Sequence, residues 1–338
     1  MGIWEDKEVK FDIPFTEMRL RPGEKIIDRL DNIEDTKGNA GDRGRLVVTN
    51  IRMLWHSITS PRINLTIGLN CIMAINTKEV NSRLTGTAQA LHILTLSNKT
   101  RFEFIFTNLV PGSTRHLTTI SGVHKAYLSS RLYRELKLRG AIIQHKHLKM
   151  LPLEQVYSTM DGVWNLSSDQ GSLGTFIVTN IRCAWFASTN EGFNISLPYI
   201  QINTIVIRDS KFGQALVITT SDESGGFVLG FRLDTEENMN KLYKELYAVY
   251  STSINHPIYG VEYQISAMSS EQQNSDILDV DAIDDPKGEI TNTLAAYLAE
   301  GGHKTDKPVY CPELGLAVEQ IKNGFTIQKL WEVIPATN

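Results

Sequence analysis

The amino-acid sequence predicts a mainly β protein: two tandem antiparallel barrels, each closed by a C-terminal helix, followed by an acidic linker and a short helical tail. Three observations lead to this fold class. A stretch of more than 100 residues is repeated, the repeat consists of short β-branched and apolar runs, and each copy ends with apolar residues at helical spacing.

The repeat is clearest in two stretches. "GDRGRLVVTNIRMLW" (residues 41–55) returns as "GSLGTFIVTNIRCAW" (residues 171–185), an offset of 130. Later the best alignment has an offset of 125 and then 110, which gives the first copy an extra loop, "TNLVPGSTRHLTTIS". Copies of this length indicate duplicated domains, not the short units of a solenoid. The matched pairs are Pro22 and Pro152, Glu24 and Glu154, Ile75 and Ile205, Phe102 and Phe227, and Tyr133 and Tyr243.

Short strands account for most of each copy. "GRLVV" and "IRMLW" are β-branched and apolar, and Thr49-Asn50 between them suits a tight hairpin because Asn tolerates a positive φ. The segments "INLTIG", "CIMAINT", "LHILTL" and "RFEFIF" follow as further strands. About seven strands are expected in each copy.

Each copy then ends in an amphipathic pattern. Leu128, Leu132 and Leu136 are spaced i, i+4 and i+8 in the first copy. In the second copy, four apolar residues lie on one helical face: Met239, Leu242, Leu246 and Val249. Seven strands with one terminal helix are typical of the pleckstrin-homology (PH) fold, and the T-N-x-R-x-x-W hairpin resembles its GRAM-type members.

These patterns divide the chain into four parts. We expect an N-terminal arm over residues 1–17, a first PH-like domain over 18–148, a second over 149–260, and an acidic linker with a helical tail over 261–338. "CPELGLAVEQIKNG" in the tail has helical spacing. An apolar chain end this short needs a barrel or another protein to cover it. The predicted partner-binding residues are Leu316, Ile321, Phe325, Leu330 and Trp331.

The net charge of −4 conceals a division between the two halves of the chain. Residues 37–146 contain 16 Lys and Arg against 4 Asp and Glu, whereas residues 149–338 contain 12 against 24. The two halves are therefore expected to face different partners.

Catalytic and metal-binding patterns are weak. His145 and His147 have a ligand-like spacing, but no Cys or acidic residue accompanies them, which favours a solvated segment. We expect no enzyme activity, no cofactor, no metal and no nucleic-acid partner. The sequence has neither an apolar run of membrane-spanning length nor a secretory signal, so a cytoplasmic protein is expected.

Basic loops of the first copy are the candidate ligand site. In PH-like barrels, basic residues of the first and third inter-strand loops hold inositol phosphates, whose oxygens accept charge-assisted hydrogen bonds. The corresponding loops of the second copy, "WNLSSDQGSL" and "ASTNEG", contain no base. An acidic protein partner would suit the same loops. The predicted lipid-binding residues are Lys37, Arg43, Arg45 and Arg62.

Two other repeated residues have a structural interpretation. Arg52 recurs as Arg182 in the copy that lost its basic loops, which indicates a role within the hairpin. Trp55 and Trp185 are expected to pack in the core or at the barrel rim.

The longest diagnostic strings are "NIEDTKGNAGDRGRLVVTNIRMLWHS", "TRFEFIFTNLVPGS", "GVWNLSSDQGSLGTF", "IRDSKFGQALVI" and "ELGLAVEQIKNGFTIQKLWEV". They closely resemble the Bardet-Biedl syndrome 5 protein family, subunits of the BBSome, over nearly the whole chain. The resemblance implies a non-enzymatic protein with two PH-like domains in a coat-like complex with β-propeller and helical-repeat subunits. That complex carries membrane proteins into and out of cilia.

The same resemblance implies phosphoinositide binding, including phosphatidylinositol 3-phosphate, at basal bodies and the peripheral ciliary membrane. It supplies no motif that matches a lipid headgroup residue by residue, so the site residues depend on the charge pattern alone. We therefore expect a lipid-sensing subunit whose first barrel faces phosphoinositides and whose remainder binds other subunits. The alternative is a purely structural adaptor in which both barrels bind proteins.

Overall fold

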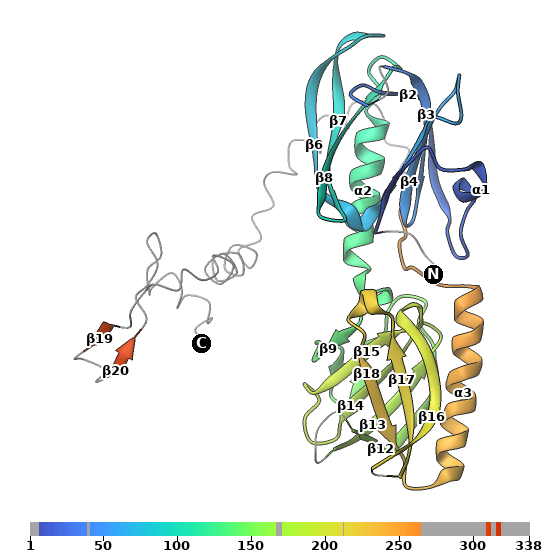
Figure 1. Cartoon of the computed structure of the whole chain (residues 1–338), viewed down its shortest axis with the longest axis vertical. Helices are drawn as coiled ribbons and strands as arrows, with labels where there is room; N and C mark the ends of the chain where they lie inside the picture. The colour runs from blue at the N-terminus through green and yellow to red at the C-terminus, as the bar shows by residue number, and fades with distance from the viewer. Residues whose placement is uncertain are drawn as a thin grey trace. The chain divides into compact units, whose positions relative to one another are not determined.

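A computed structural model describes residues 7–38, 41–166, 171–211, 213–264, 309–311 and 316–318. Most of these residues form two eight-stranded sheets of antiparallel strands, each followed by a long helix (Figure 1). The predicted mainly β class with two tandem PH-like barrels is confirmed. We call β1–β8 with α2 the first barrel, and β9 and β12–β18 with α3 the second barrel.

The first barrel has the strand order β1-β5-β4-β3-β2-β8-β7-β6. Apart from β1 with β5 and β2 with β8, neighbouring strands follow one another in the sequence, as expected for sequential antiparallel pairing. Its elements are β1 (Val9–Phe11), α1 (Phe15–Met18), β2 (Ile26–Asp35), β3 (Arg43–Thr49), β4 (Arg52–Ser57), β5 (Asn64–Gly68), η1 (Leu69–Cys71), β6 (Ile72–Ser82), β7 (Gly86–Ser97), β8 (Thr100–Asn108), α2 (Arg115–Ser129) and η2 (Arg131–Tyr133).

The second barrel has the order β16-β17-β18-β12-β13-β14-β15-β9, which is the same topology read from the other edge. The duplication therefore extends to the complete sheet. Its elements are β9 (Lys137–Leu138), β12 (Val156–Asn165), β13 (Ser172–Thr179), β14 (Arg182–Ala187), β15 (Asn194–Pro198), η3 (Tyr199–Gln201), β16 (Ile202–Ser210), β17 (Gly213–Thr220), η4 (Asp222–Ser224), β18 (Val228–Arg232) and α3 (Glu236–Asn255). A hairpin of β10 (Ile143–Gln144) and β11 (His147–Leu148) lies between β9 and β12.

Each sheet has one strand more than the seven expected. β1 pairs with β5, placing Phe11 opposite Leu65, and β9 pairs with β15, placing Leu138 opposite Ile195. The two edge strands share no sequence pattern, and the constant offset of the repeat begins after both of them. The matching pairing partners, β5 and β15, show that they are equivalent.

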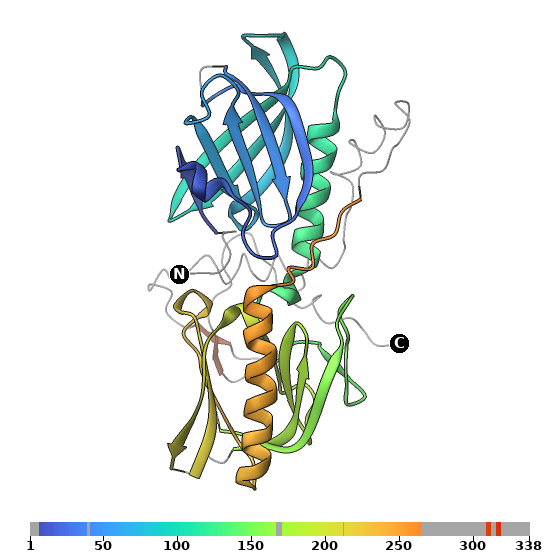
Figure 2. The same cartoon turned by 90° about the vertical axis from the view of Figure 1, so that its right-hand side faces the viewer.

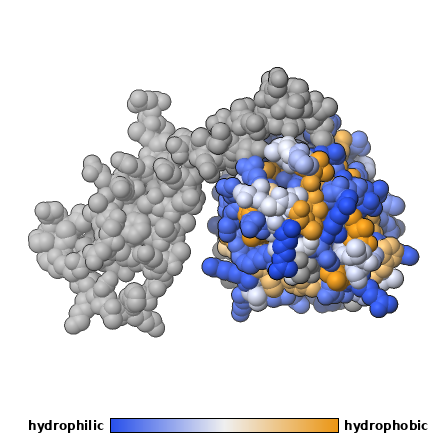
Figure 3. All heavy atoms as spheres, turned by 90° about the horizontal axis from the view of Figure 1, so that it is seen from above, coloured by the Kyte–Doolittle hydropathy of each residue, from blue (hydrophilic) through white to orange (hydrophobic). Residues whose placement is uncertain are grey.

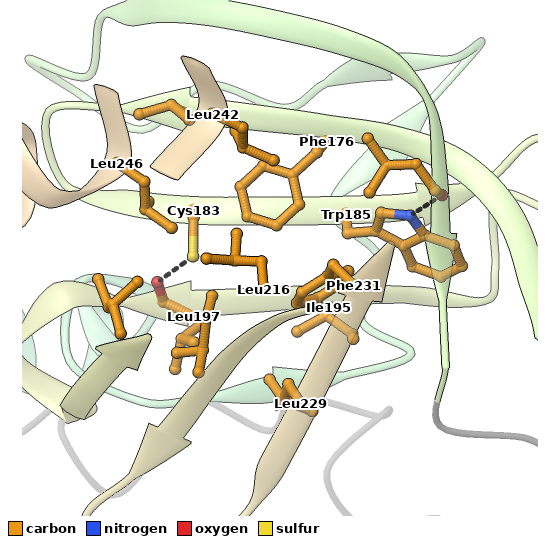
Figure 4. Close-up of a cluster of buried hydrophobic side chains, with 14 of the residues drawn as sticks. Phe176, Cys183, Trp185, Ile195, Leu197, Leu216, Leu229, Phe231, Leu242 and Leu246 are labelled. Atoms are coloured by element: carbon orange, nitrogen blue, oxygen red, sulfur yellow. Dashed lines mark hydrogen bonds between the residues drawn. The ribbon is translucent and has the colours of Figure 1, made fainter. Parts of the chain in front are cut away.

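Tryptophan packing confirms the predicted core role of Trp55 and Trp185. Both side chains are fully buried, and each indole Nε1 donates to a backbone oxygen 3.0 Å away, Ile33 O in one barrel and Val163 O in the other. A Cβ at Gly44 would overlap the Trp55 ring, so this position of β3 needs glycine. Figure 4 shows the second barrel, where Trp185 packs beside Phe231 and Ile195.

The repeated hairpin contains a buried ion pair, which confirms the structural interpretation of Arg52. Arg52 Nε and Nη2 donate to Glu24 at 2.9 and 3.1 Å, and Thr49 Oγ1 donates to the same carboxylate at 2.8 Å. Asn50 acts through its side chain, which binds Gly23 O and Lys25 N. Asn50 does not have the positive φ that the tight hairpin suggested.

The predicted helical face at Leu128, Leu132 and Leu136 is wrong. α2 ends at Ser129, where Ser130 Oγ bonds the Ala126 carbonyl, and Leu132 lies in the short η2 turn. Leu132 and Leu136 instead pack against apolar clusters of the second barrel. Their spacing arises from burial against another sheet and not from a continuing helix.

The alignment of Tyr133 with Tyr243, at an offset of 110, is also wrong, because it pairs a residue after α2 with one inside α3. α2 begins after Thr114 and α3 begins after Thr235, an offset of 121. Half of the supposed extra loop, from Arg115 onward, is the first half of α2. In α3 the expected face is confirmed, since Met239, Leu242 and Leu246 are buried and Val249 is partly buried.

After α3 the chain returns to the first barrel (Figure 2). We call residues 257–264 the return segment. Tyr259, 1% exposed, donates its hydroxyl to Pro22 O at 2.9 Å, and Arg134 Nη1 donates to Tyr259 O at 2.6 Å. A Cβ on Gly122 of α2 would overlap the Tyr263 ring. The return segment therefore covers the corner at Pro22 and one side of α2.

In the tail, the described residues form a two-stranded sheet of β19 (Val309–Cys311) and β20 (Leu316–Val318). The predicted helix over "CPELGLAVEQIKNG" is therefore wrong at residues 316–318. β-branched and aromatic side chains in both stretches favour strands, and the cross-strand pairing outweighs the helical spacing. The rest of that predicted helix lies outside the described residues.

Candidate functional site

The four predicted lipid-binding residues lie on three different elements of the first barrel. Arg43 and Arg45 lie on β3 and flank Gly44, whose α-carbon faces the Trp55 ring. Because side chains alternate along a strand, both arginines point to the outer face of the sheet. Lys37 follows β2, and Arg62 lies in the turn between β4 and β5.

Two of these four cations are already paired with acids of the same barrel. Arg45 Nε lies 2.5 Å from Asp31 Oδ1 on β2, and Lys37 Nζ is ion-paired with Glu103 on β8. Both pairs are partly exposed, so each contributes about 0–1 kcal/mol to stability. Asp31 precedes the basic stretch in the sequence, so the charge count did not include it.

Glu103 also contacts a histidine. His92 Nε2 lies 2.8 Å from Glu103 Oε1, while Lys37 binds the other carboxylate oxygen. Burial, followed by the charges of Lys78 and Lys37, lowers the pKa of His92. Near neutral pH the uncharged imidazole therefore donates to Glu103, and the carboxylate charge is balanced by Lys37.

The other two cations have no acidic partner in the described part of the chain. Arg43 Nε donates to the neutral amide oxygen of Asn32 at 2.7 Å. The Arg62 side chain is exposed, and its backbone oxygen accepts from Asn64. Arg43 O accepts from Ile58 N at 3.0 Å, which joins β3 to the start of the turn that contains Arg62. Arg43 and Arg62 therefore offer the most available positive charge.

Sequence reasoning did not include Arg83, which the fold brings to the same loop. A Cβ on Gly41 would lie 3.6 Å from Arg83 Cβ, at the turn between β6 and β7. The two residues are 42 positions apart, and only the curvature of the sheet makes them neighbours. Hydrophilic residues with interspersed apolar ones cover the end of the molecule drawn in Figure 3.

One basic residue lies beside the corresponding loops of the second barrel, although the loops themselves contain no base. Arg139 follows the edge strand β9, and its guanidinium lies 5.5 Å from the centre of the Phe193 ring. Both residues line a cavity of about 510 Å³, together with Ser172, Thr189 and Asn190. The two loops contain no base, as expected. Arg139 was not predicted beside them, because this residue comes from outside the aligned repeat.

The equivalent position in the first barrel is acidic. Asp12 N donates to Asn64 O at 2.8 Å, just as Arg139 N donates to Asn194 O at 2.7 Å, and both residues have a positive φ. Asp12 Oδ1 also accepts from Asn64 N at 3.1 Å. At this edge the first barrel has an acidic residue and the second a basic one. In the loops, by contrast, the first barrel has the basic residues and the second has none.

Most of the predicted partner-binding residues lie outside the part of the chain that the structure describes. The predicted partner-binding residues Ile321, Phe325, Leu330 and Trp331 lie outside the described residues, and of Leu316 only the backbone, in β20, is described. Within the described ranges, no group of three or more His, Cys, Asp or Glu is arranged to hold a metal ion. None of the helices described there has the length and hydropathy needed to cross a membrane.

Comparison with known proteins gives the family. The model of the Bardet-Biedl syndrome 5 protein N-terminal PH-like domain matches residues 24–129, and that of the second PH-like domain matches residues 137–263. Together the two matches cover every strand of both barrels except β1. This chain belongs to the Bardet-Biedl syndrome 5 protein family.

Full-length relatives of the family agree. BBSome complex member BBS5 of Danio rerio is 53% identical over 338 residues, covering 98% of each chain. The Homo sapiens protein of the same name is 53% identical over 342 residues, again covering 98% of each chain. BBSome complex member bbs-5 of Caenorhabditis elegans is 41% identical, covering 98% of this chain and 97% of its own length.

Proposed function

We propose that this chain is a non-enzymatic subunit of the BBSome that takes part in ciliary membrane-protein trafficking. The relatives that match 98% of the chain are BBSome complex members, and this observation carries the proposal. Its partners would be other BBSome subunits, and its location the cytoplasm, the basal body and the ciliary membrane as a peripheral protein. Association with tagged BBSome subunits in a pull-down tests this assignment.

We further propose that the first barrel binds phosphoinositide headgroups, phosphatidylinositol 3-phosphate among them, through Lys37, Arg43, Arg45 and Arg62. Arg43 and Arg62 support the idea most, because neither has an acidic partner in the described residues. A phosphate monoester can replace the neutral amide of Asn32 as the acceptor for Arg43 and gains a charge-assisted bond.

Lys37 and Arg45 would contribute less. Each must leave a partly exposed ion pair, which costs about 0–1 kcal/mol. A Lys or Arg near an anionic membrane contributes about 1 kcal/mol. The net gain from these two residues is therefore small, and Arg43 and Arg62 should dominate binding.

Liposome flotation tests the lipid proposal. Arg43→Glu with Arg62→Glu should abolish flotation with vesicles containing phosphatidylinositol 3-phosphate, while the complex still assembles. Lys241→Glu with Lys244→Glu, on the exposed side of α3, makes the same change in net charge and should leave flotation intact. Equal losses in both variants would show nonspecific attraction and exclude a site on the first barrel.

The alternative is a structural adaptor in which both barrels bind proteins. The pairing of Arg45 with Asp31 and of Lys37 with Glu103 favours it, since these acids reduce the charge available to a phosphate. In that case the Arg43 and Arg62 variant would lose assembly with other subunits, and flotation of the purified chain would not change.

The tail is proposed to bind other subunits through five residues: Leu316, Ile321, Phe325, Leu330 and Trp331. Apolar side chains near a chain end support this, because a segment this short cannot bury them alone. Truncation after residue 314 should leave both barrels folded and reduce recovery of partner subunits at least tenfold. Unchanged recovery would place subunit binding on the barrels.

A further inference from the structure

Three large apolar side chains are exposed in the connections between elements of the first barrel. Ile58 follows β4, Leu84 lies in the turn between β6 and β7, and Val110 lies in the loop between β8 and α2. Their exposed fractions are 48%, 54% and 45%, so none of them belongs to the core. Single exposed apolar residues are ordinary, but a group of them at one end of a domain marks an interaction surface.

Arg43 connects two of these three positions. Its backbone oxygen accepts from Ile58 N at 3.0 Å, and its Nε donates to the side-chain oxygen of Asn32 at 2.7 Å. The backbone oxygen of Asn32 accepts from Leu109 N at 2.9 Å, directly before Val110. Ile58 and Val110 therefore lie at the same end of the barrel as the candidate phosphate site.

A buried carboxylate holds the turn between β6 and β7 at that end as well. Glu34 pairs with Arg43 across β2 and β3, and it accepts from the Ser82 hydroxyl. Ser82 Oγ accepts in turn from Leu84 N at 3.0 Å. Figure 1 draws the turn between β6 and β7 at the top of the first barrel, and Figure 3 views that end, where apolar residues lie among hydrophilic ones.

The connections at this end carry more positive than negative charge. Those that follow β2, β4, β6 and β8 contain three Lys or Arg against one acid. The acid, Asp42, lies 3.2 Å from the Ser57 hydroxyl, which donates to it. Two of the bases, Arg62 and Arg83, share their turns with Ile58 and Leu84. The ranges counted are 36–42, 58–63, 83–85 and 109–114.

The second barrel lacks this combination of apolar and basic residues. Its corresponding connections contain one Lys against three Asp or Glu. Ser188 takes the place of Ile58 at the repeat offset of 130, and no large apolar side chain is exposed among the described residues of these connections. The ranges counted are 166–171, 188–193, 211–212 and 233–235.

An anionic bilayer fits this end of the first barrel better than a protein does. A protein interface gathers its apolar groups in one packed core, whereas here they project from three separate connections. At a membrane surface, apolar side chains enter the boundary between headgroups and acyl chains, while Lys and Arg stay at the level of the phosphates. Both kinds of residue are present here, with the charge that anionic lipid attracts.

We propose that Ile58, Leu84 and Val110 insert into the boundary between headgroups and acyl chains of an anionic bilayer. This insertion rests on the proposed lipid binding by the first barrel, and it adds an apolar contact to the headgroup contacts of Arg43 and Arg62. Because the apolar contact needs an intact bilayer, it should affect binding to vesicles and not binding to a soluble headgroup.

A fluorescent label at position 58 reports insertion directly. The full-length chain carries Cys311→Ser, and Ile58→Cys takes an environment-sensitive dye, since Cys71 and Cys183 are buried. The vesicles contain phosphatidylcholine, phosphatidylserine and phosphatidylinositol 3-phosphate. Spin-labelled lipid in these vesicles should quench the dye at least twofold. Val228→Cys, 67% exposed on β18 of the second barrel, is the matched control and should not be quenched.

Binding to the same vesicles gives the second readout. Ile58→Asn with Leu84→Asn keeps the net charge and should weaken vesicle binding at least tenfold, while the soluble inositol headgroup of phosphatidylinositol 3-phosphate binds as to the wild type. Leu153→Asn with Val228→Asn replaces two exposed apolar residues of the second barrel and should not change vesicle binding. Circular dichroism checks that both double variants are folded.

The two proposals fail in different ways. Equal vesicle binding by the wild type and the Ile58 and Leu84 variant, or an unquenched dye at position 58, would overturn insertion alone if the soluble headgroup still binds. A wild type that binds neither headgroup nor vesicles would overturn both proposals. Loss of BBSome subunits from the Ile58 and Leu84 variant, with vesicle binding unchanged, would overturn insertion and assign these residues to a protein partner.

Discussion

Arg52 and Glu24 form an ion pair in which neither side chain is exposed, with Nε and Oε1 2.9 Å apart. The second barrel repeats the pair with Arg182 and Glu154 at 2.8 Å. Arg52 also donates to the backbone oxygens of Glu17 and Arg19, and Arg182 donates to Lys149 O and to the Ser196 hydroxyl. A buried pair of this kind is stable only while both partners are present.

Arg182→Met should therefore destabilise the second barrel by about 3–5 kcal/mol, because Glu154 would stay buried without a cation. Urea unfolding, together with hydrogen exchange at β14, measures the loss. The double variant Arg182→Met with Glu154→Leu should recover most of it, since no buried charge remains. A single-variant loss below about 1 kcal/mol would contradict this account.

Leu153 and Gly23 predict opposite responses to exchange. Leu153 has a φ of 62° and its side chain is 68% exposed, so Leu153→Gly removes backbone strain and little packing. We expect a gain of about 1 kcal/mol in thermal or urea unfolding. Gly23→Leu should cost more than that, because Pro257 occupies the space that a Cβ needs. A change in stability of the same sign in both variants would contradict these opposite roles of backbone strain and packing.

His116 predicts a pH dependence of stability. It is 1% exposed, burial lowers its pKa from 6.5 to about 4, and neither ring nitrogen has a partner among the described residues. Between these pKa values the unfolded chain binds a proton that the folded chain excludes, so stability falls as the pH falls from 6.5 towards 4.

His116→Leu removes this dependence. The free energy of unfolding lost between pH 7 and pH 5 should be about 2 kcal/mol smaller in the variant than in the wild type. The same substitution at exposed His147 serves as the control and should not change the loss. Equal pH dependence in all three proteins would show that His116 is protonated in the folded chain.

The sequence predicted the features that both copies share. Trp55, Arg52, their counterparts in the second copy and most strands lie in the constant-offset region, where two occurrences of one pattern support each other. Edge strands β1 and β9 were missed because they precede that region and differ in sequence. Helical spacing at Leu132 and Leu136 was misleading because they pack on the other sheet, a contact that periodicity cannot distinguish.

The candidate site was predicted only in part. Its cations follow from loop composition, but the acids that pair with Lys37 and Arg45 come from β8 and β2. Arg139 lies beside the loops of the second barrel but comes from outside the aligned repeat. Such neighbours depend on strand curvature and register, which one sequence does not specify.

The return segment also constrains the order in which the chain can mature. Tyr259 and Pro22, joined by a hydrogen bond, are separated by 237 residues. On a ribosome, the entire second barrel must leave the exit tunnel before the corner of the first can be sealed. Domains usually finish folding in the order of synthesis, whereas here the earliest one is completed last, and one side of its α2 stays uncovered until residues 257–264 have been made.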